Sequence, residues 1–169
     1  SIKTGFTHKN SSLILVGERK DELGGSVLYS LFNELGKNIP KPDLEEVKNQ
    51  IFGITECIEN GLIRSCHDIS DGGIATSLCE MTFKNLIGCE VSIDSNLSND
   101  KILFSETGGF VLETKDKNVS SIQRIFNNYN IPIIKIGKTT GEKIKINNVI
   151  DILIMDAKHN WENGLRNKI

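Results

Sequence analysis

Aromatic side chains are scarce in this chain of 169 residues, because Phe, Trp and Tyr together make up only 6% of it. Aliphatic residues must therefore build most of the core, and isoleucine is visibly the favoured one. Apolar runs long enough to cross a bilayer are also missing. The polar stretch from Ser1 to Asn10 does not resemble a signal peptide. We expect neither a membrane partner nor a secreted protein.

Long blocks of one charge sign are absent as well. Lys and Arg number 20 against 22 Asp and Glu, for a net charge of -2, which gives no bulk support to nucleic-acid binding. The four cysteines form no C-x-x-C pair and have no histidine at ligand spacing, which argues against zinc; they are Cys57, Cys66, Cys79 and Cys89. We expect reduced thiols in a cytoplasmic protein rather than disulfides.

The composition that remains, 38% hydrophobic and 25% charged, is that of an ordinary globular protein. A chain of this size can bury one proper core, so we expect a single domain over residues 12–169. Residues 1–11 have the character of a linker from upstream domains that this sequence lacks. The start at Ser1, without Met, favours a fragment of a longer protein.

Apolar periodicity predicts alternating elements along the chain. Strands are expected at residues 13–16, 62–66, 89–93, 110–114, 131–136, 143–146 and 149–154. Helices are expected at residues 27–35, 44–58, 74–83, 119–129 and 155–165, with residues 96–106 irregular or briefly helical. The inner face of the first helix would carry Leu28, Leu31, Phe32 and Leu35. That of the second would carry Leu44, Val47, Ile51, Ile54 and Ile58.

Strands and helices are mixed in this pattern without strict alternation. The fold class expected is therefore α+β, or a layered α/β sandwich, with helices packed on a mixed sheet.

The segment Asp21–Ser26 joins a predicted strand to a predicted helix and contains a glycine pair. Glycines let a backbone approach an anion closely, and the free N–H groups of a helix start favour negative charge. Gly24, Gly25 and Ser26 are thus candidates for binding phosphate or a similar ligand. The alternative, which the spacing alone favours, is a tight turn with Ser26 as a plain N-cap.

The segment 67–73, His-Asp-Ile-Ser-Asp-Gly-Gly, also lies between a strand and a helix. Its two carboxylates are weak candidates for holding Mg²⁺, and its histidine could exchange protons or contact phosphate. The ligand candidates here are His67, Asp68, Ser70, Asp71, Gly72 and Gly73. A capped turn, with Asp71 as the cap, explains the residue types equally well.

A third segment, residues 103–109, places Glu106 before another glycine pair. Glu106 joins Asp68 and Asp71 as a weak metal candidate, although such a residue is more often a solvated loop acid. No residue pattern identifies a catalytic nucleophile with its base.

Taken in order, these segments resemble the last domain of the phosphoribosylformylglycinamidine synthase family. The resemblance covers roughly residues 10–166 and rests on four segments. They are residues 13–26, residues 61–75, residues 103–106, and the late strand and final helix with Ile131-Pro132, Ile136-Gly137, Trp161 and Leu165. One departure is Gly109, near which related sequences often carry an arginine after the acidic loop.

The resemblance implies an ATP-dependent, amidine-forming carbon–nitrogen ligase of purine biosynthesis. ATP would phosphorylate the amide oxygen of formylglycinamide ribonucleotide, and glutamine-derived ammonia would displace the phosphate. The family also implies Mg²⁺, a glutaminase subunit PurQ and a small subunit PurS as partners. Its phosphoryl-transfer histidine and main Mg²⁺–ATP ligands lie in earlier domains, so we expect this chain alone to be inactive.

Two alternatives stay open at this point. One is a free-standing nucleotide- or phosphate-binding module. The other is a domain of a related ATP-using enzyme such as aminoimidazole ribonucleotide synthetase, whose C-terminal domain would share the layered fold.

Overall fold

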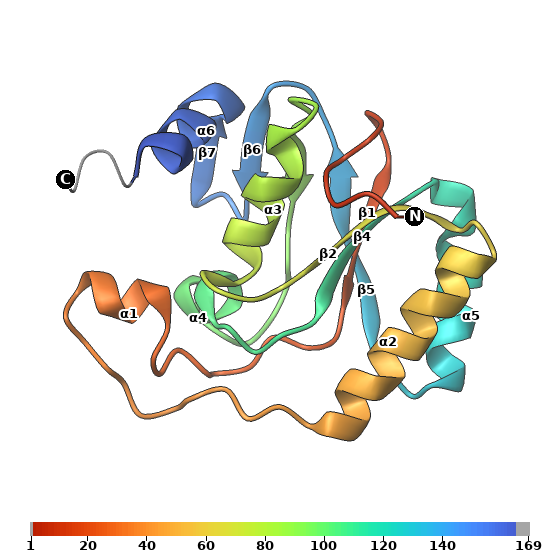
Figure 1. Cartoon of the computed structure of the whole chain (residues 1–169), viewed down its shortest axis with the longest axis horizontal. Helices are drawn as coiled ribbons and strands as arrows, with labels where there is room; N and C mark the ends of the chain where they lie inside the picture. The colour runs from red at the N-terminus through yellow and green to blue at the C-terminus, as the bar shows by residue number, and fades with distance from the viewer. Residues whose placement is uncertain (1, 165–169) are drawn as a thin grey trace.

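The structure, a computed structural model, describes residues 2–164 and contains one seven-stranded mixed sheet (Figure 1). The strand order is β2-β4-β1-β5-β3-β6-β7. All neighbouring strands are antiparallel except β3 and β6, which run parallel. The strands are β1 (Ser12–Val16), β2 (Ile63–Asp68), β3 (Cys89–Val91), β4 (Phe110–Thr114), β5 (Ile133–Thr139), β6 (Lys143–Ile146) and β7 (Ile150–Leu153). The predicted α+β class with a mixed sheet is confirmed.

Helices cover both faces of the sheet and divide the apolar core into two clusters. They are α1 (Val27–Leu31), α2 (Leu44–Glu59), α3 (Gly73–Phe83), α4 (Asn99–Phe104), α5 (Val119–Asn128) and α6 (Ile154–Asn163), with a 3₁₀ turn at Asp116–Asn118. Helices α3, α4 and α6 gather on one side, and α2 packs beside α5 on the other (Figure 1). Leu165, predicted in the last helix, lies outside the described residues, as does Ser1.

The continuous apolar run of β1 is explained by its place between β4 and β5 in the middle of the sheet. Successive side chains of a strand point to opposite faces. Leu13 and Leu15 accordingly enter the cluster under α3, whereas Ile14 and Val16 enter the cluster under α2 and α5. A strand buried on both faces needs no polar alternation.

The prediction for the first helix was wrong in both length and face. Helix α1 ends at Leu31, with Phe32 as its C-cap, because Asn33 turns into the left-handed region with φ +56°. The supposed inner residues Leu31, Phe32 and Leu35 are 69%, 69% and 78% exposed. Nothing among residues 2–164 covers them.

The predicted inner face of α2 was also wrong, although its start at the Asp43 cap and its end before Asn60 were correct. Of the predicted face only Ile54 is buried; the helix instead buries Gln50, Gly53, Ile54 and Cys57. Gly53 explains the rotation, since a Cβ there would lie 2.6 Å from the Phe126 ring of α5. Close approach of the two helices at this glycine turns the other apolar residues outward.

The segment before β1, predicted as a linker, packs into the domain. The Phe6 side chain is fully buried in the core, and its N–H donates to the Met81 carbonyl at 2.7 Å. Lys3 forms a parallel bridge with Ser65 at the outer edge of β2. The core therefore begins before residue 12, and attachment to upstream domains stays a prediction.

Among residues 2–164, no helix has the length and apolar character needed to cross a membrane.

Candidate functional site

The three glycine-containing segments meet at the carboxylate of Glu106. Its Oε1 atom accepts hydrogen bonds from the backbone N–H of Val27 and from that of Gly72, each at 2.8 Å. Val27 is the first residue of α1, and Gly72 is the N-cap of α3. One carboxylate oxygen thus joins the starts of two helices from a loop that follows α4. Glu106 is partly buried, so it is not the solvated loop acid that the residue type favours.

In the first turn, the backbone N–H groups are already engaged within the chain. Gly24 donates to the Asn38 carbonyl at 2.8 Å, Gly25 to the Leu35 carbonyl at 2.7 Å, and Ser26 to Leu23 at 3.1 Å. The Ser26 hydroxyl accepts from the Tyr29 N–H and caps α1. This geometry is that of the tight capped turn. Binding of phosphate by Gly24, Gly25 and Ser26 stays a prediction, because the next N–H, that of Val27, also has an acceptor in Glu106.

In the second turn, His67 is held from two sides. Its Nε2 atom lies 3.2 Å from Glu80 Oε2, and its Nδ1 atom lies 2.7 Å from the backbone oxygen of Asp68. The Asp68 carboxylate is mostly exposed and lies 3.5 Å from the same ring. Ser77 of α3 donates its hydroxyl to the Asp68 backbone oxygen at 2.9 Å. His67 therefore fixes the end of β2 against α3.

Asp71 does not cap α3, in contrast to the capped-turn alternative. The N-cap is Gly72, at φ +78° and without a side-chain cap, and Asp71 is exposed with no hydrogen bond to residues 2–164. Gly73, at φ +68°, packs so closely on α4 that a Cβ would lie 2.5 Å from the Leu103 carbonyl oxygen. The exposed carboxylate of Asp71 and the exposed Ser70 are free to meet a ligand from outside.

The carboxylates proposed for Mg²⁺ are not gathered into a metal site. Within residues 2–164, no group of three or more His, Cys, Asp or Glu side chains is placed to hold a metal ion. The Glu106 oxygen that faces Gly72 is an acceptor of N–H groups rather than one of several oxygens around a cavity. Metal binding by Asp68, Asp71 or Glu106 stays a prediction.

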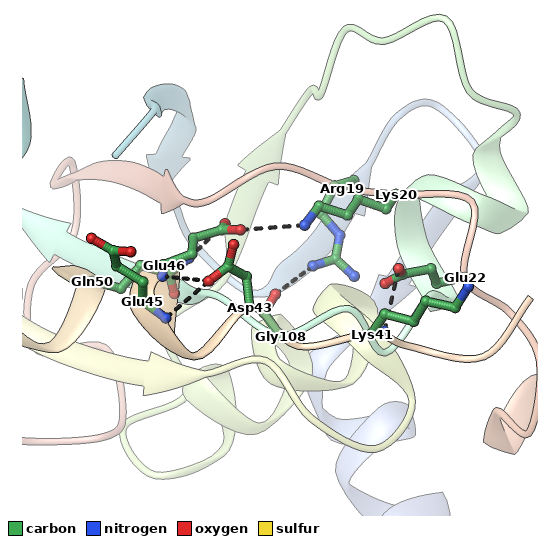
Figure 2. A network of polar contacts seen from close by, with 9 residues as sticks. All are labelled: Arg19, Lys20, Glu22, Lys41, Asp43, Glu45, Glu46, Gln50 and Gly108. Carbon is green, nitrogen blue, oxygen red and sulfur yellow. Dashed lines mark hydrogen bonds and ion pairs between the residues drawn. The ribbon is translucent and has the colours of Figure 1, made fainter. Parts of the chain in front are cut away.

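Arg19 holds the loop that carries Glu106, a role that no pattern in the sequence indicates. Its guanidinium donates to the carbonyl oxygens of Ile102, Ser105 and Gly108 and to the Ser105 hydroxyl. Figure 2 shows the bond from Arg19 to Gly108, which measures 2.8 Å. Burial lowers the pKa of Arg19 to about 10, and the nearby Glu22 carboxylate opposes that shift. The side chain remains a cation at neutral pH and fixes the position of Glu106.

Figure 2 also shows how the turn after β1 reaches the start of α2. Lys20 Nζ lies 3.3 Å from Glu46 Oε2, and Glu46 Oε1 accepts from the Gln50 amide at 3.1 Å. Asp43 caps α2 by accepting from the N–H groups of Glu45 and Glu46. The polar stretch that follows β1 is therefore joined to the start of α2 through Lys20 and Glu46.

A second buried acid, Glu113 of β4, was also missed. It is fully buried, and its carboxylate accepts from the backbone N–H groups of Thr7 and His8 and from the hydroxyls of Thr7, Ser11 and Ser65. A single Glu within an apolar predicted strand was the available signal, because a buried charge has to be hydrogen-bonded.

The cysteines are all free, as expected. Burial raises the pKa of Cys57, Cys66 and Cys89 to about 12 and that of Cys79 to about 11. These thiols are neutral at physiological pH, so they pack as small apolar groups rather than act as nucleophiles.

The sequence matches one known protein family over most of its length. Residues 9–147 match the family described as AIR synthase related protein, C-terminal domain. The chain belongs to this family. The match includes all three segments that meet at Glu106.

Two similar curated proteins illustrate the relatives of this chain. The chain is 33% identical over 167 residues to phosphoribosylformylglycinamidine synthase subunit PurL of Thermoanaerobacter sp. (strain X514), covering 95% of the chain and 23% of the relative. It is 37% identical over 146 residues to the PurL subunit of Thermococcus sibiricus, covering 82% of the chain and 20% of the relative. The chain therefore spans about a fifth of the length of these relatives.

Solved structures with the same fold include PurL of Thermotoga maritima. The one described as complexed with FGAR has a TM-score of 0.78 at 15% identity, covering 92% of this chain and 29% of the other. The one described as PurLQS of the same organism has a TM-score of 0.73 at 17% identity, with 90% and 27% covered. At these identities the likeness establishes the fold of this AIR synthase related domain.

Proposed function

We propose that this chain is the C-terminal domain of a phosphoribosylformylglycinamidine synthase. The observation that carries the proposal is the family match over residues 9–147, together with relatives of that name over 82–95% of the chain. The whole enzyme is an ATP-dependent carbon–nitrogen ligase of purine biosynthesis in the cytoplasm. It converts formylglycinamide ribonucleotide and ammonia to formylglycinamidine ribonucleotide.

The reaction has two balanced steps. The amide oxygen of the substrate attacks the γ-phosphorus of ATP and releases ADP, with Mg²⁺ neutralising the phosphate charge. Ammonia then adds to the activated carbon, and phosphate leaves with the former amide oxygen to give the amidine. Ammonia comes from a PurQ glutaminase with PurS, a proposal supported by the solved PurLQS assembly of T. maritima.

The role of this domain within the enzyme is to bind and position rather than to react. Within residues 2–164 no metal-holding cluster is present, and the cysteine thiols are neutral. The exposed residues Ser70 and Asp71, close to Glu106 in the chain fold, are proposed to line the ligand cleft, whereas Ser26 is buried and caps α1. We expect the 169-residue chain alone to have no synthase activity.

The test is an assay of the longer protein that contains this domain. The purified protein receives formylglycinamide ribonucleotide, ATP, Mg²⁺ and ammonium chloride, and ADP release and amidine product are measured together. We expect both products in equal amounts, and neither from the 169-residue chain alone. Absence of amidine from the folded longer protein would contradict the proposal.

Within that active protein, Asp71→Asn and Ser70→Ala test the cleft assignment. Both residues are exposed and make no side-chain hydrogen bond within residues 2–164, so folding stability should stay the same. A rise in KM for the ribonucleotide or ATP, at unchanged melting temperature, would support the cleft. Unchanged kinetics in both variants would remove these residues from it.

A further inference from the structure

The segment between the first turn and α2 forms a closed loop with its large apolar side chains on the outside. We call residues 24–39 the α1 loop. Its two ends are joined by the Gly24 N–H donating to Asn38 and the Gly25 N–H donating to Leu35. It projects from the sheet beside α4 (Figure 1). The exposed apolar side chains are Val27, Leu31, Phe32, Leu35 and Ile39, at 45% to 78% exposure.

The α1 loop is ordered by its own contacts and not by these apolar side chains. Gly36, at φ +71°, lies so close to Tyr29 that a Cβ there would be 2.5 Å from the Tyr29 ring, and a Cβ on Gly24 would be 2.7 Å from Asn38. Glu106 then fixes the start of α1 through the Val27 N–H. A loop built in this way presents a preformed apolar surface, and such surfaces mark contact sites.

The area of this surface indicates whether it binds a separate chain or another domain of the same chain. A large apolar side chain has on the order of 100 Å² to bury, so five of them at these exposures offer about 300 to 400 Å². A stable complex between separate chains needs about 800 Å² from each partner. Contacts between domains of one chain are smaller, from about 300 Å² per side, because the covalent link supplies a high effective concentration.

We infer that the α1 loop is the surface on which another domain of the same longer chain docks. This inference rests on the proposed function, under which the chain is one domain of a longer synthase. The relatives support it in one respect, since the chain spans only about a fifth of their length. The occupant is an apolar face on that longer chain, and docking holds Val27 and Glu106 at the edge of the proposed ligand cleft.

Hydrogen–deuterium exchange tests the inference without any activity measurement. Peptides covering residues 27–39 are compared between the 169-residue chain and the longer protein. We expect exchange at least tenfold slower in the longer protein, whereas the exposed turn at Val149, distant in sequence, serves as internal reference. Equal exchange of the α1 loop in both proteins would overturn the inference.

Substitutions on the α1 loop give a second test of the inference. Leu31→Asp with Leu35→Asp should leave the melting temperature of the 169-residue chain unchanged, because both side chains are exposed, but should remove the added protection in the longer protein. Val149→Asp, at a residue 56% exposed, is the matched control and should keep that protection. Protection retained in the double variant would overturn the inference.

Further outcomes distinguish failure of the docking inference from failure of the proposed function. If the 169-residue chain forms a dimer in sedimentation that Leu31→Asp dissociates, the occupant is a second copy and the inference is overturned. If the longer protein lacks synthase activity yet protects the α1 loop, the docking inference stands and the proposed function fails. If the longer protein has synthase activity but does not protect the α1 loop, the proposed function stands and the docking inference is overturned.

Discussion

Replacing Glu113 by Gln, a side chain of nearly the same shape, should destabilise the domain strongly. The carboxylate is fully buried on β4 and accepts five hydrogen bonds. Oε1 accepts from the His8 N–H at 3.0 Å and the Ser11 hydroxyl at 2.7 Å. Oε2 accepts from the N–H and hydroxyl of Thr7 and from the Ser65 hydroxyl, at 2.8 to 2.9 Å. The segment before β1 is held to the sheet through these bonds.

The expected loss of unfolding free energy depends on which of the five donors can find another acceptor. A Gln side chain keeps one acceptor oxygen and replaces the other with an NH₂ group that cannot accept. Hydroxyls can rotate, but a backbone N–H cannot, so the amide of His8 or of Thr7 loses its acceptor. Such a loss costs about 1 to 3 kcal/mol, and the retained bonds weaken because the acceptor is no longer charged. We expect a total of about 3 kcal/mol.

Urea unfolding of the 169-residue chain measures this change. The midpoint should fall at constant slope, and the melting temperature should fall by about 6 to 12 °C for a domain of this size. Glu90→Gln on β3 is the matched control, because its side chain is exposed, and it should change stability by less than about 0.5 kcal/mol. A loss below about 0.5 kcal/mol for Glu113→Gln would refute the reasoning, since it would mean that the cost of burying the charge cancels its hydrogen bonds.

Three other changes have expected outcomes. Arg19→Lys should lose about 2 to 3 kcal/mol in urea unfolding, because an ammonium cannot serve the carbonyls around loop 102–108 together; an effect no larger than that of exposed Arg124→Lys would contradict this. Glu106→Ala should speed exchange of the Val27 and Gly72 amides, whereas Glu106→Gln, which keeps an acceptor oxygen, should not; equal exchange in the two variants would refute the bridge. Burial raises the pKa of Cys89 to about 12, so its contribution to stability is full below about pH 8.5 and falls as pH rises towards 12. About 1.5 to 2 kcal/mol is lost by pH 10, and a Cys89→Ala variant with the same fall in stability between pH 8 and 10 would disprove this.

The elements that the sequence predicted well are those whose apolar pattern has one explanation. The run at residues 13–16 is apolar at every position, and β1 is buried on both faces. The stops at Asn60 and Gly61 ended α2 as predicted, because the signal there is local backbone chemistry. The strand predicted at residues 131–136 is present but begins one residue after Pro132, because proline cannot donate to the ladder.

The faces of α1 and α2 were not predictable from periodicity. Both helices carry apolar residues on more than one side, and the buried side of α2 is selected by Gly53, which lets Phe126 approach. A glycine lowers the apparent hydrophobicity of the very face that packs most closely. For α1 the pattern predicted a helix that reaches Leu35, but the helix ends at Leu31, and residues 2–164 do not cover its apolar side chains.

Candidate site residues were found from the sequence, whereas their connection was not. The three segments lie about 45 and 35 residues apart, and they are joined by one oxygen of Glu106 that accepts two backbone N–H groups. Backbone donors are invisible in a sequence, so a lone acid beside glycines suggests a metal ligand or a solvated loop. The first turns of the two helices leave backbone N–H groups that need an acceptor. A nearby carboxylate on another segment is the simplest such acceptor, and Arg19, buried beneath the same loop, is the group that keeps it there.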